Sequence, residues 1–386
     1  MSKSKRREQL KFLATLVFAL IVGMFCGYTA RRSAAWTSLV LHRDVRLVVW
    51  VLFVGWCVAC LALSGKYLVA NSRTATWACG VSTFLFMYLS ESVLISDLIR
   101  WIVRKIGPQT ISQKTLFVGL GWVCIAFVLV MTLMGFFEAR NIKTVSYRIP
   151  IAGLSCPCRL VLLSDLHIGY YVGRRHVQKT VERVNEANAD MVVIAGDLIN
   201  AGNTRECPEI DKVARLLANM KSKEGTFAVL GNHDPAVDDP ELQQFLQASR
   251  IRLLEDEVYT NDCIQLIGRT TRTKPRKTME QMLSDTDPDK PCVVADHDPL
   301  GIREAAGKAA LVMCGHTHKG QVFPLNLFVR MLYSREECWG LGETQGTHTV
   351  VSAGTGYFSI PMRSGSHCEV TVVDLYPEKD RTETVQ

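Results

Sequence analysis

The hydrophobic positions of this chain change their spacing near residue 140. Before that point they form long uninterrupted runs, which lie at residues 12–30, 47–63 and 116–137. Each run is long enough to cross about 30 Å of hydrocarbon. A fourth, less apolar run lies at residues 77–103 and contains Glu91 and Asp97. The pattern predicts an N-terminal membrane domain, residues 1–139, with about four transmembrane helices.

Two features of this membrane domain allow more than one interpretation. Glu91 and Asp97 either lie at the interface or pair inside the helical bundle, as we expect, or they mark a functional intramembrane acid. The first run follows several basic residues, as the apolar region of a signal peptide does. That run is long, has no small-x-small cleavage site and precedes further apolar runs, so we expect a retained anchor.

Beyond residue 140 the apolar runs become short, and helical patterns separate them. Residues 160–163, 191–195 and 227–230 have the length and branching of buried strands. Between them, residues 176–188 and 210–220 place apolar side chains on one face of a helix. This alternation favours parallel strands that are joined by crossover helices.

Short apolar runs of the same kind continue to the end of the chain. Further strands are expected at residues 141–149, 252–260, 263–269, 292–295, 310–314, 348–352 and 369–375. The second and third of these read as a hairpin, because turn-forming residues separate them. We therefore predict one soluble α/β domain at residues 140–376, followed by a flexible charged tail at residues 377–386.

Charge and cysteine content bear on orientation and compartment. The net charge is +7, but basic residues are spread almost evenly over the two sides of the predicted spans, so they do not decide the orientation. Eight of the 13 cysteines lie beyond residue 150 and form no dense, regular framework. We therefore expect a multi-pass protein of the cell membrane whose soluble domain lies in the reducing cytoplasm.

One segment of the soluble domain is strongly basic. Residues 269–277 contain five Lys and Arg side chains. Such segments are usually solvated loops, and this is our expectation here. The alternative is a basic rim that contacts an anionic substrate.

Candidate metal ligands follow the predicted strands in order along the chain. They are Asp165, His167, Asp197, Asn232, His297, His316 and His318. Sites in α/β sheets form at the carboxyl ends of strands, which is where these residues stand. In extended backbone, residues two apart point the same way, so Asp165 and His167 can reach one ion. The set predicts a site for two metal ions.

The donor atoms of this set indicate which metals and which ligand it suits. Mixed nitrogen and oxygen donors suit Mn, Fe or Zn better than Mg or Ca. Asp197 can bridge two ions, because it has two carboxylate oxygens. One ion would be completed by Asp165, His167 and His318. The other would be completed by Asn232, His297 and His316. Two divalent ions beside two carboxylates keep a net charge of about +2, which favours a phosphate group.

The order of these motifs resembles that of the calcineurin-like metallophosphoesterases. The chain reads Asp-x-His, Gly-Asp, Gly-Asn-His-Asp, His and Gly-His-x-His, and the resemblance covers residues 145–375. It implies two mixed β-sheets sandwiched between helices, and it implies that the seven residues above bind metal. It further implies that His233 stabilises the transition state or protonates the leaving oxygen, and that Asp234 orients His233.

The apolar leader points to one subgroup of that family. Multi-span leaders ahead of such a domain resemble the transmembrane proteins with a metallophosphoesterase domain, as do Gly354-Thr355-Gly356 and Pro361-Met362-Arg363. Two positions depart from the family pattern. Asp296 stands before His297, where we expect a small or apolar residue. Residues 269–272 are Arg-Thr-Thr-Arg where relatives often place aspartates, which speaks against an accessory acidic role.

Together these features predict a membrane-anchored phosphoesterase that uses two divalent metal ions to hydrolyse a phosphodiester or pyrophosphate bond. The predicted membrane domain, residues 1–139, occupies over a third of the chain, so we expect a lipid-linked substrate, for example the UDP-2,3-diacylglucosamine that related lipid A enzymes cleave. The expected partners are this substrate and the membrane, and no nucleic acid. The alternatives are a protein or general phosphatase, and a catalytically silent, metal-stabilised binding module at the membrane.

Overall fold

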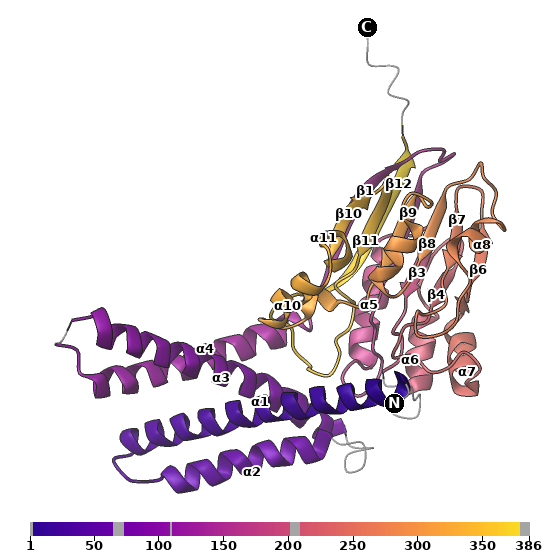
Figure 1. Ribbon diagram of the computed structural model, residues 1–386. Helices are drawn as coiled ribbons and strands as arrows, with labels where there is room; N and C mark the ends of the chain where they lie inside the picture. The colour runs from indigo at the N-terminus through magenta and orange to yellow at the C-terminus, as the bar shows by residue number, and fades with distance from the viewer. Residues whose placement is uncertain (1–2, 65–72, 109, 201–208, 379–386) are drawn as a thin grey trace. The chain divides into compact units, whose positions relative to one another are not determined.

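The structure is a computed structural model that describes residues 3–64, 73–108, 110–200 and 209–378 (Figure 1). The chain divides into two compact units, Met1–Leu133 and Met134–Gln386. From the sequence we placed this boundary a few residues later, between residues 139 and 140. The last turns of one helix belong to the second unit, where the carbonyl oxygen of Gly135 accepts a hydrogen bond of 3.0 Å from the Arg363 backbone N–H.

The first unit is helical. It comprises α1 (Lys3–Val40), α2 (Arg46–Ser64), α3 (Arg73–Ile106) and most of α4 (Gln113–Glu138). Within the described residues, α3 and α4 are long and apolar enough to cross a membrane, with mean hydropathies of 1.5 and 2.5. The described apolar part of α2 is shorter, and side chains 1–19, where the first predicted span begins, lie outside the described residues. Two apolar helices thus indicate a membrane association, and the four-span arrangement stays a prediction.

Asp97 of α3 is paired inside the first unit. Its carboxylate accepts a hydrogen bond of 3.0 Å from the Arg100 guanidinium, and further hydrogen bonds from Arg32 and Tyr28 of α1. Two guanidinium groups neutralise the carboxylate locally. Pairing inside the bundle, the first of our two interpretations, therefore fits Asp97.

The second unit contains two six-stranded sheets (Figure 1). The first sheet has the order β1 (Ile142–Ile151), β12 (Cys368–Pro377), β2 (Cys158–Leu163), β3 (Met191–Ala195), β4 (Thr226–Val229), β5 (Ile251–Leu253). The second has the order β10 (Gly340–Thr344), β11 (Thr347–Val351), β9 (Leu311–Cys314), β8 (Cys292–Ala295), β7 (Gln265–Gly268), β6 (Glu257–Thr260). The pairs β12–β2, β10–β11 and β6–β7 are antiparallel and the other neighbours parallel. Both sheets are therefore mixed, and the predicted fold class of this unit is confirmed.

Helices connect and cover the strands. The connections of the first sheet contain α5 (Arg174–Glu186), α6 (Ile210–Leu217) and α7 (Pro240–Ser249). Those of the second contain α8 (Met279–Leu283), η2 (Pro299–Gly301), α9 (Ile302–Ala305), η3 (His318–Gly320), α10 (Leu325–Leu332) and α11 (Arg335–Cys338). The helices expected at residues 176–188 and 210–220 are thus found as α5 and α6.

Strand residues alternate between two hydrophobic cores. Leu160 of β2 and Leu311 of β9 belong to the core between the two sheets. Val312, the next residue of β9, instead packs in a second core with Met282 of α8 and Ile302 of α9. Because successive strand side chains point to opposite faces, a sheet covered on both faces needs uninterrupted apolar strands. This is why the strand runs of this domain read as wholly apolar.

Two cysteines bear on our expectation about the compartment. Cys156 and Cys263 form a disulfide, with Cα atoms 5.6 Å apart and a sequence separation of 107. The bond joins the loop before β2 to the turn between β6 and β7. Disulfides persist in oxidising compartments and are rare in the cytosol. The cysteine content therefore does not support a cytoplasmic domain.

Candidate metal centre

Both sheets bring polar residues to one place. Strands β2, β3, β4, β8 and β9 end just before Asp165, Asp197, Asn232, His297 and His316. Five of the seven predicted ligands have positive φ, between 45° and 71°: Asp165, His167, Asp197, His316 and His318. Non-glycine residues rarely adopt this conformation, which costs energy and concentrates at functional sites. The backbone is thus held in costly conformations where the candidate ligands stand.

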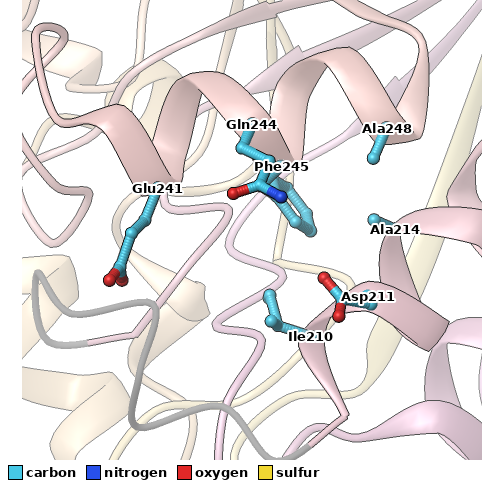
Figure 2. Close-up of a pocket in the computed structure, with 7 residues that line it drawn as sticks. All are labelled: Ile210, Asp211, Ala214, Glu241, Gln244, Phe245 and Ala248. Atoms are coloured by element: carbon cyan, nitrogen blue, oxygen red, sulfur yellow. The ribbon is translucent and has the colours of Figure 1, made fainter.

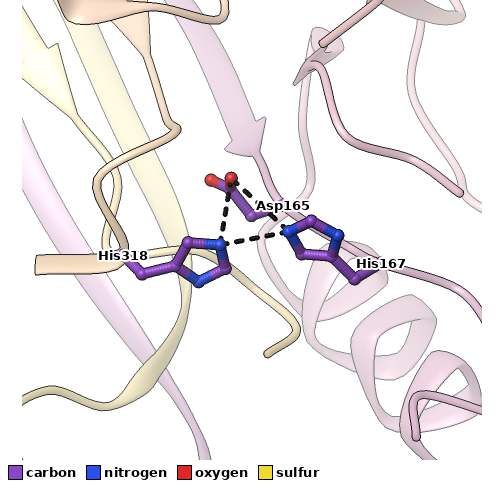
Figure 3. Close-up of side chains that lie close together, drawn as sticks. All are labelled: Asp165, His167 and His318. Carbon is purple, nitrogen blue, oxygen red and sulfur yellow. Dashed lines mark hydrogen bonds and ion pairs between the residues drawn. The ribbon is translucent and has the colours of Figure 1, made fainter. Parts of the chain in front are cut away.

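The first cluster consists of Asp165, His167 and His318, all buried (Figure 3). The Nε2 atoms of His167 and His318 lie 3.1 Å apart. Asp165 Oδ1 lies 3.3 Å from Nε2 of His318 and 4.0 Å from Nε2 of His167. Three donor atoms from two loops, the one after β2 and the one after β9, therefore converge on one point.

The second cluster consists of Asp197, His297 and His316. His297 Nε2 lies 3.2 Å from Asp197 Oδ2 and 3.1 Å from His316 Nδ1. Asn232 Oδ1 is 3.1 Å from the same His297 nitrogen. Asp197 Oδ2 also lies 3.5 Å from His167 Nε2, which places this carboxylate between the two clusters.

The hydrogen-bond partners of His297 show that this arrangement fits a cation. Its Nδ1 is 2.9 Å from the Ala195 carbonyl oxygen, which can only accept, so Nδ1 carries a proton. In the neutral ring, Nε2 then presents a lone pair to the oxygens of Asp197 and Asn232. Acceptors face acceptors, which is stable only with a proton or a metal ion between them. The residues present therefore fit a metal ion, and the two buried clusters together suggest a dinuclear site for divalent ions.

Burial keeps the two imidazoles of the first cluster neutral, as metal ligands must be, but it opposes ionisation of the carboxylate. It lowers the pKa of His167 to about 3 and that of His318 well below the usual value, so both rings are neutral. It also raises the pKa of Asp165 to about 6. Neutral imidazole nitrogens have the free lone pairs that metal binding requires.

In the second cluster a carboxylate and an imidazole balance each other. Burial alone would lower the pKa of His297, but the charge of Asp197 and its hydrogen bond raise it to about 10. Burial likewise opposes ionisation of Asp197, yet His297 holds its pKa below the usual range. A proton on His297 thus occupies the position that a metal ion would take.

Glycines permit the close approach of these loops. A Cβ atom on Gly231 would lie 2.0 Å from Asp197 Oδ1, and one on Gly315 would lie 1.5 Å from Ser164 Oγ. Any side chain at either position would therefore displace the loops that carry Asp165 and Asp197. Glycine at these two positions therefore lets the backbone approach the ligands closely.

His233 lies beside the first cluster. Its backbone N–H donates a hydrogen bond of 2.9 Å to Asp197 Oδ1. Its half-buried ring packs against His167, with ring centroids 5.4 Å apart, and against Phe358, at 4.4 Å. The ring therefore stands at the edge of the centre with a fixed orientation.

The hydrogen bonds of Asp234 join its carboxylate to backbone N–H groups. Its Oδ1 accepts a hydrogen bond of 2.8 Å from the Ile199 N–H, and its Oδ2 accepts one of 2.8 Å from the Gly231 N–H. Within the described residues, no hydrogen bond joins this carboxylate to the His233 ring. Asp234 therefore fixes the loop that carries His233, and its role in orienting the His233 imidazole stays a prediction.

Two residues at the centre were missed in the sequence. Phe358 packs on His233 and, with centroids 5.0 Å apart, on His167. Arg363, fully buried, donates from Nη2 to His318 Nδ1 at 3.1 Å and from Nη1 to the Ala353 oxygen at 2.8 Å. A guanidinium only donates, so His318 Nδ1 accepts here and the proton of the neutral ring lies on Nε2, which must lose this proton before it can bind a metal ion. Arg363 had drawn attention only as part of Pro361-Met362-Arg363, and no pattern marked Phe358.

The basic segment 269–277 is neither a solvated loop nor a substrate rim at its two ends. Arg269 and Arg276 are buried. Arg276 donates to Asp296 and to Glu304, each at 2.7 Å. The Asp before His297, one of the two departures from the family pattern, is therefore neutralised by an Arg of the basic segment.

A cavity of about 220 Å³ between α6 and α7 lies apart from these residues (Figure 2). Its lining includes the carboxylates of Asp211 and Glu241 around Phe245. None of the predicted ligands lines it. This cavity is therefore not the metal centre.

Comparison with known proteins finds relatives of the part of the chain that contains the centre. Residues 158–320 match the family model described as Calcineurin-like phosphoesterase. A Danio rerio "Transmembrane protein with metallophosphoesterase domain" is 29% identical over 388 residues, which cover 95% of this chain and 80% of the relative. An "Uncharacterized metallophosphoesterase" of Helicobacter pylori (strain J99) is 32% identical over 231 residues, or 57% of this chain and 60% of the relative.

Other relatives are matched over a smaller part of their length. A Bos taurus "Transmembrane protein with metallophosphoesterase domain" is 30% identical over 239 residues, so that this chain spans only 52% of it. A solved archaeal phosphodiesterase has a TM-score of 0.30 at 14% identity, a likeness too weak to add support. The matched segment 158–320 contains both clusters of donor residues. The chain therefore carries a metal-dependent phosphoesterase domain of the calcineurin-like family.

Proposed function

We propose that this chain is a membrane-anchored enzyme that hydrolyses a phosphodiester or pyrophosphate bond with two divalent metal ions. The observation that carries the proposal is the contact of His297 Nε2 with Asp197 Oδ2 and Asn232 Oδ1, at 3.2 and 3.1 Å. These acceptors need a cation between them. A centre that holds two such cations attracts the anionic phosphate of a substrate.

The proposed ligand sets follow the two clusters. Asp165, His167 and His318 hold one ion. Asn232, His297 and His316 hold the other, and Asp197 bridges both. Because the donors are imidazole, carboxylate and amide, we propose Mn, Fe or Zn as the native metals.

The residues of the chain divide the chemical work. Bound divalent ions would polarise a phosphoryl oxygen and lower the pKa of water. His233 stands beside His167 and can donate a ring proton to the leaving oxygen. Asp234 keeps the His233 loop in place through the Gly231 and Ile199 N–H groups. Phe358 packs on the His233 ring and limits its motion.

The proposal is tested with the purified full chain, loaded with Mn, Fe or Zn and assayed on bis-p-nitrophenyl phosphate and p-nitrophenyl phosphate. Asp197→Asn should lose bound metal and turnover together, because it removes the bridging charge. His233→Ala should keep its metal and lose about 10²–10⁴-fold in turnover. Asp211→Asn, an exposed carboxylate in the cavity of Figure 2, is the matched control and should change neither. Full activity of either site variant overturns the assignment.

We propose that the substrate is lipid-linked, as in UDP-2,3-diacylglucosamine. In support, α4 ends at Glu138 and β1 begins at Ile142, so the linker between an apolar helix and the domain is short. A short linker keeps the domain close to a membrane that α4 enters. Comparing an acylated substrate with its deacylated headgroup tests this. Equal hydrolysis of both would leave a tethered general phosphoesterase.

We also propose that the first unit is a multi-pass anchor and that the second unit lies on the non-cytoplasmic side. The apolar helices α3 and α4 support the anchor. The Cys156–Cys263 disulfide supports the side. Alkylation of intact cells with N-ethylmaleimide before reduction should leave these two cysteines unmodified. If both are alkylated, the domain lies in a reducing compartment.

A further inference from the structure

Helix α10 (Leu325–Leu332) exposes almost all of its apolar side chains. None of its eight residues is buried. The exposed fractions of Met331, Leu332 and Phe328 are 80%, 76% and 56%. Surface helices of soluble domains normally bury one apolar stripe, and contiguous exposed apolar patches mark interaction sites. The apolar surface of α10 is therefore a candidate interaction site.

Within the same unit, two hydrogen bonds from backbone N–H groups link the start of α10 to the end of α4 through one loop. The Phe323 N–H, just before α10, donates to Ser364 Oγ at 3.2 Å. The neighbouring Arg363 N–H donates to the Gly135 oxygen of α4 at 3.0 Å. Phe137, in the last turn of α4, is 66% exposed. One short loop thus holds α10 beside the end of a helix that is apolar enough to cross a membrane.

Cations lie beside the apolar side chains. A cavity of about 660 Å³ is lined from α10, α11 and neighbouring segments, and its charged lining residues are Lys319, Arg330 and Arg335. No acidic side chain lines it. Lys319 Nζ lies 3.4 Å from the centre of the Trp339 ring. Basic residues next to exposed apolar ones match the headgroup and acyl layers of an anionic lipid surface.

We propose that α10 and the last turn of α4 form a membrane-docking face of the catalytic domain, which rests on an anionic phospholipid surface. Phe137, Phe323, Phe328, Met331 and Leu332 enter the acyl boundary, and the cavity with Lys319, Arg330 and Arg335 takes a phosphate headgroup. Lys319 directly follows His318 of the first cluster, so this face adjoins the metal centre. A phosphate ester at the membrane surface can then reach the centre without leaving the bilayer. The face does not depend on which ester is cleaved.

Photocrosslinking of the full chain tests the occupant directly. The chain is reconstituted in vesicles of phosphatidylcholine with phosphatidylglycerol, and p-benzoylphenylalanine replaces Met331. The matched control places the same group at Glu257, an exposed position of β6. We expect phospholipid adducts from position 331 and none from position 257. Crosslinks from 331 to residues 1–133 or to a second copy, or no crosslink at all, would overturn the proposal.

A second arm tests the headgroup preference. The yield of lipid adduct at position 331 should fall several-fold when phosphatidylglycerol is omitted. It should fall equally in the presence of phosphatidylglycerol when Arg330→Gln and Arg335→Gln are combined. Equal yields with and without the anionic lipid would overturn the anionic preference. Neither arm measures turnover, so an inactive metal centre and an absent docking face give different results.

Discussion

Two segments of the second unit that carry cations differ in what their charges contact. In residues 269–277, Arg276 is buried between Asp296 and Glu304. In residues 319–335, the cations line a cavity without an acidic residue, and within the described part of the chain no ion pair involves them. The first segment neutralises Asp296, the residue before the metal-ligand candidate His297. The cations of the second segment line a cavity that can accept a ligand. The number of cations in a segment thus does not tell what they do, because acids on neighbouring elements decide it.

Among the tests of this contrast, Arg276→Met should cause the largest change in the free energy of unfolding. Removing the cation leaves Asp296 buried and unpaired, and we expect the free energy of unfolding to fall by about 3–5 kcal/mol. Urea unfolding of the metal-loaded chain measures this. The double variant Arg276→Met with Asp296→Asn should recover part of the loss. A loss below about 1 kcal/mol in the single variant would show that the pair resembles an exposed ion pair.

A smaller effect is expected at His176, which is buried without an acid. Its Nε2–H donates to the Thr355 oxygen at 2.7 Å, and burial lowers its pKa to about 4. The unfolded chain, with a pKa of about 6.5, takes up a proton at higher pH than the folded one. The stability that neutral His176 contributes is therefore present above pH 6.5 and is lost as pH falls toward 4.

Unfolding measured at neutral pH and near pH 4.5 checks this value. Wild type should lose about 2–3 kcal/mol more than His176→Gln between the two conditions. The comparison with the variant cancels the contributions of other titrating groups. If the free energies of unfolding of wild type and His176→Gln changed in parallel with pH, His176 would be protonated at little cost inside the fold. A buried cation would then not need an acidic partner at this position.

The smallest effect belongs to the second segment. Arg330→Gln combined with Arg335→Gln should change the free energy of unfolding by no more than about 0.5 kcal/mol, because both side chains are exposed and form no ion pair with any described residue. Thermal unfolding in detergent measures it. A loss comparable with that of Arg276→Met would place these cations among the structural ones and remove the contrast.

Local sequence signals were enough for most strands and for the gathering of the donor residues, but they merged β5 and β6 into one strand at residues 252–260 and missed β10. Asp165, Asp197 and His316 each follow an apolar run, and parallel strands end at one edge, so their proximity follows from the order of the runs. The helices α5 and α6 were equally visible, because apolar spacing marks one face of each.

Long-range pairing was not visible in the same way. The disulfide joins Cys156 to Cys263 across 107 positions, and nothing near either residue marks the other. Arg276 and Asp296 each looked anomalous until the fold brought them together. Phe358 lies in a late loop without periodicity, and its place beside His233 depends on the closure of both sheets.

The first cluster joins His167 to His318, which are 151 positions apart. While the chain leaves the ribosome, His167 emerges long before His318, and β9 must pair with β8 before the two imidazoles can meet. Contacts of such wide separation form late in folding. A metal ion therefore cannot act as the nucleus on which this domain folds. A newly made chain assembles first and is loaded afterwards, so the ion must be supplied in the compartment where folding ends.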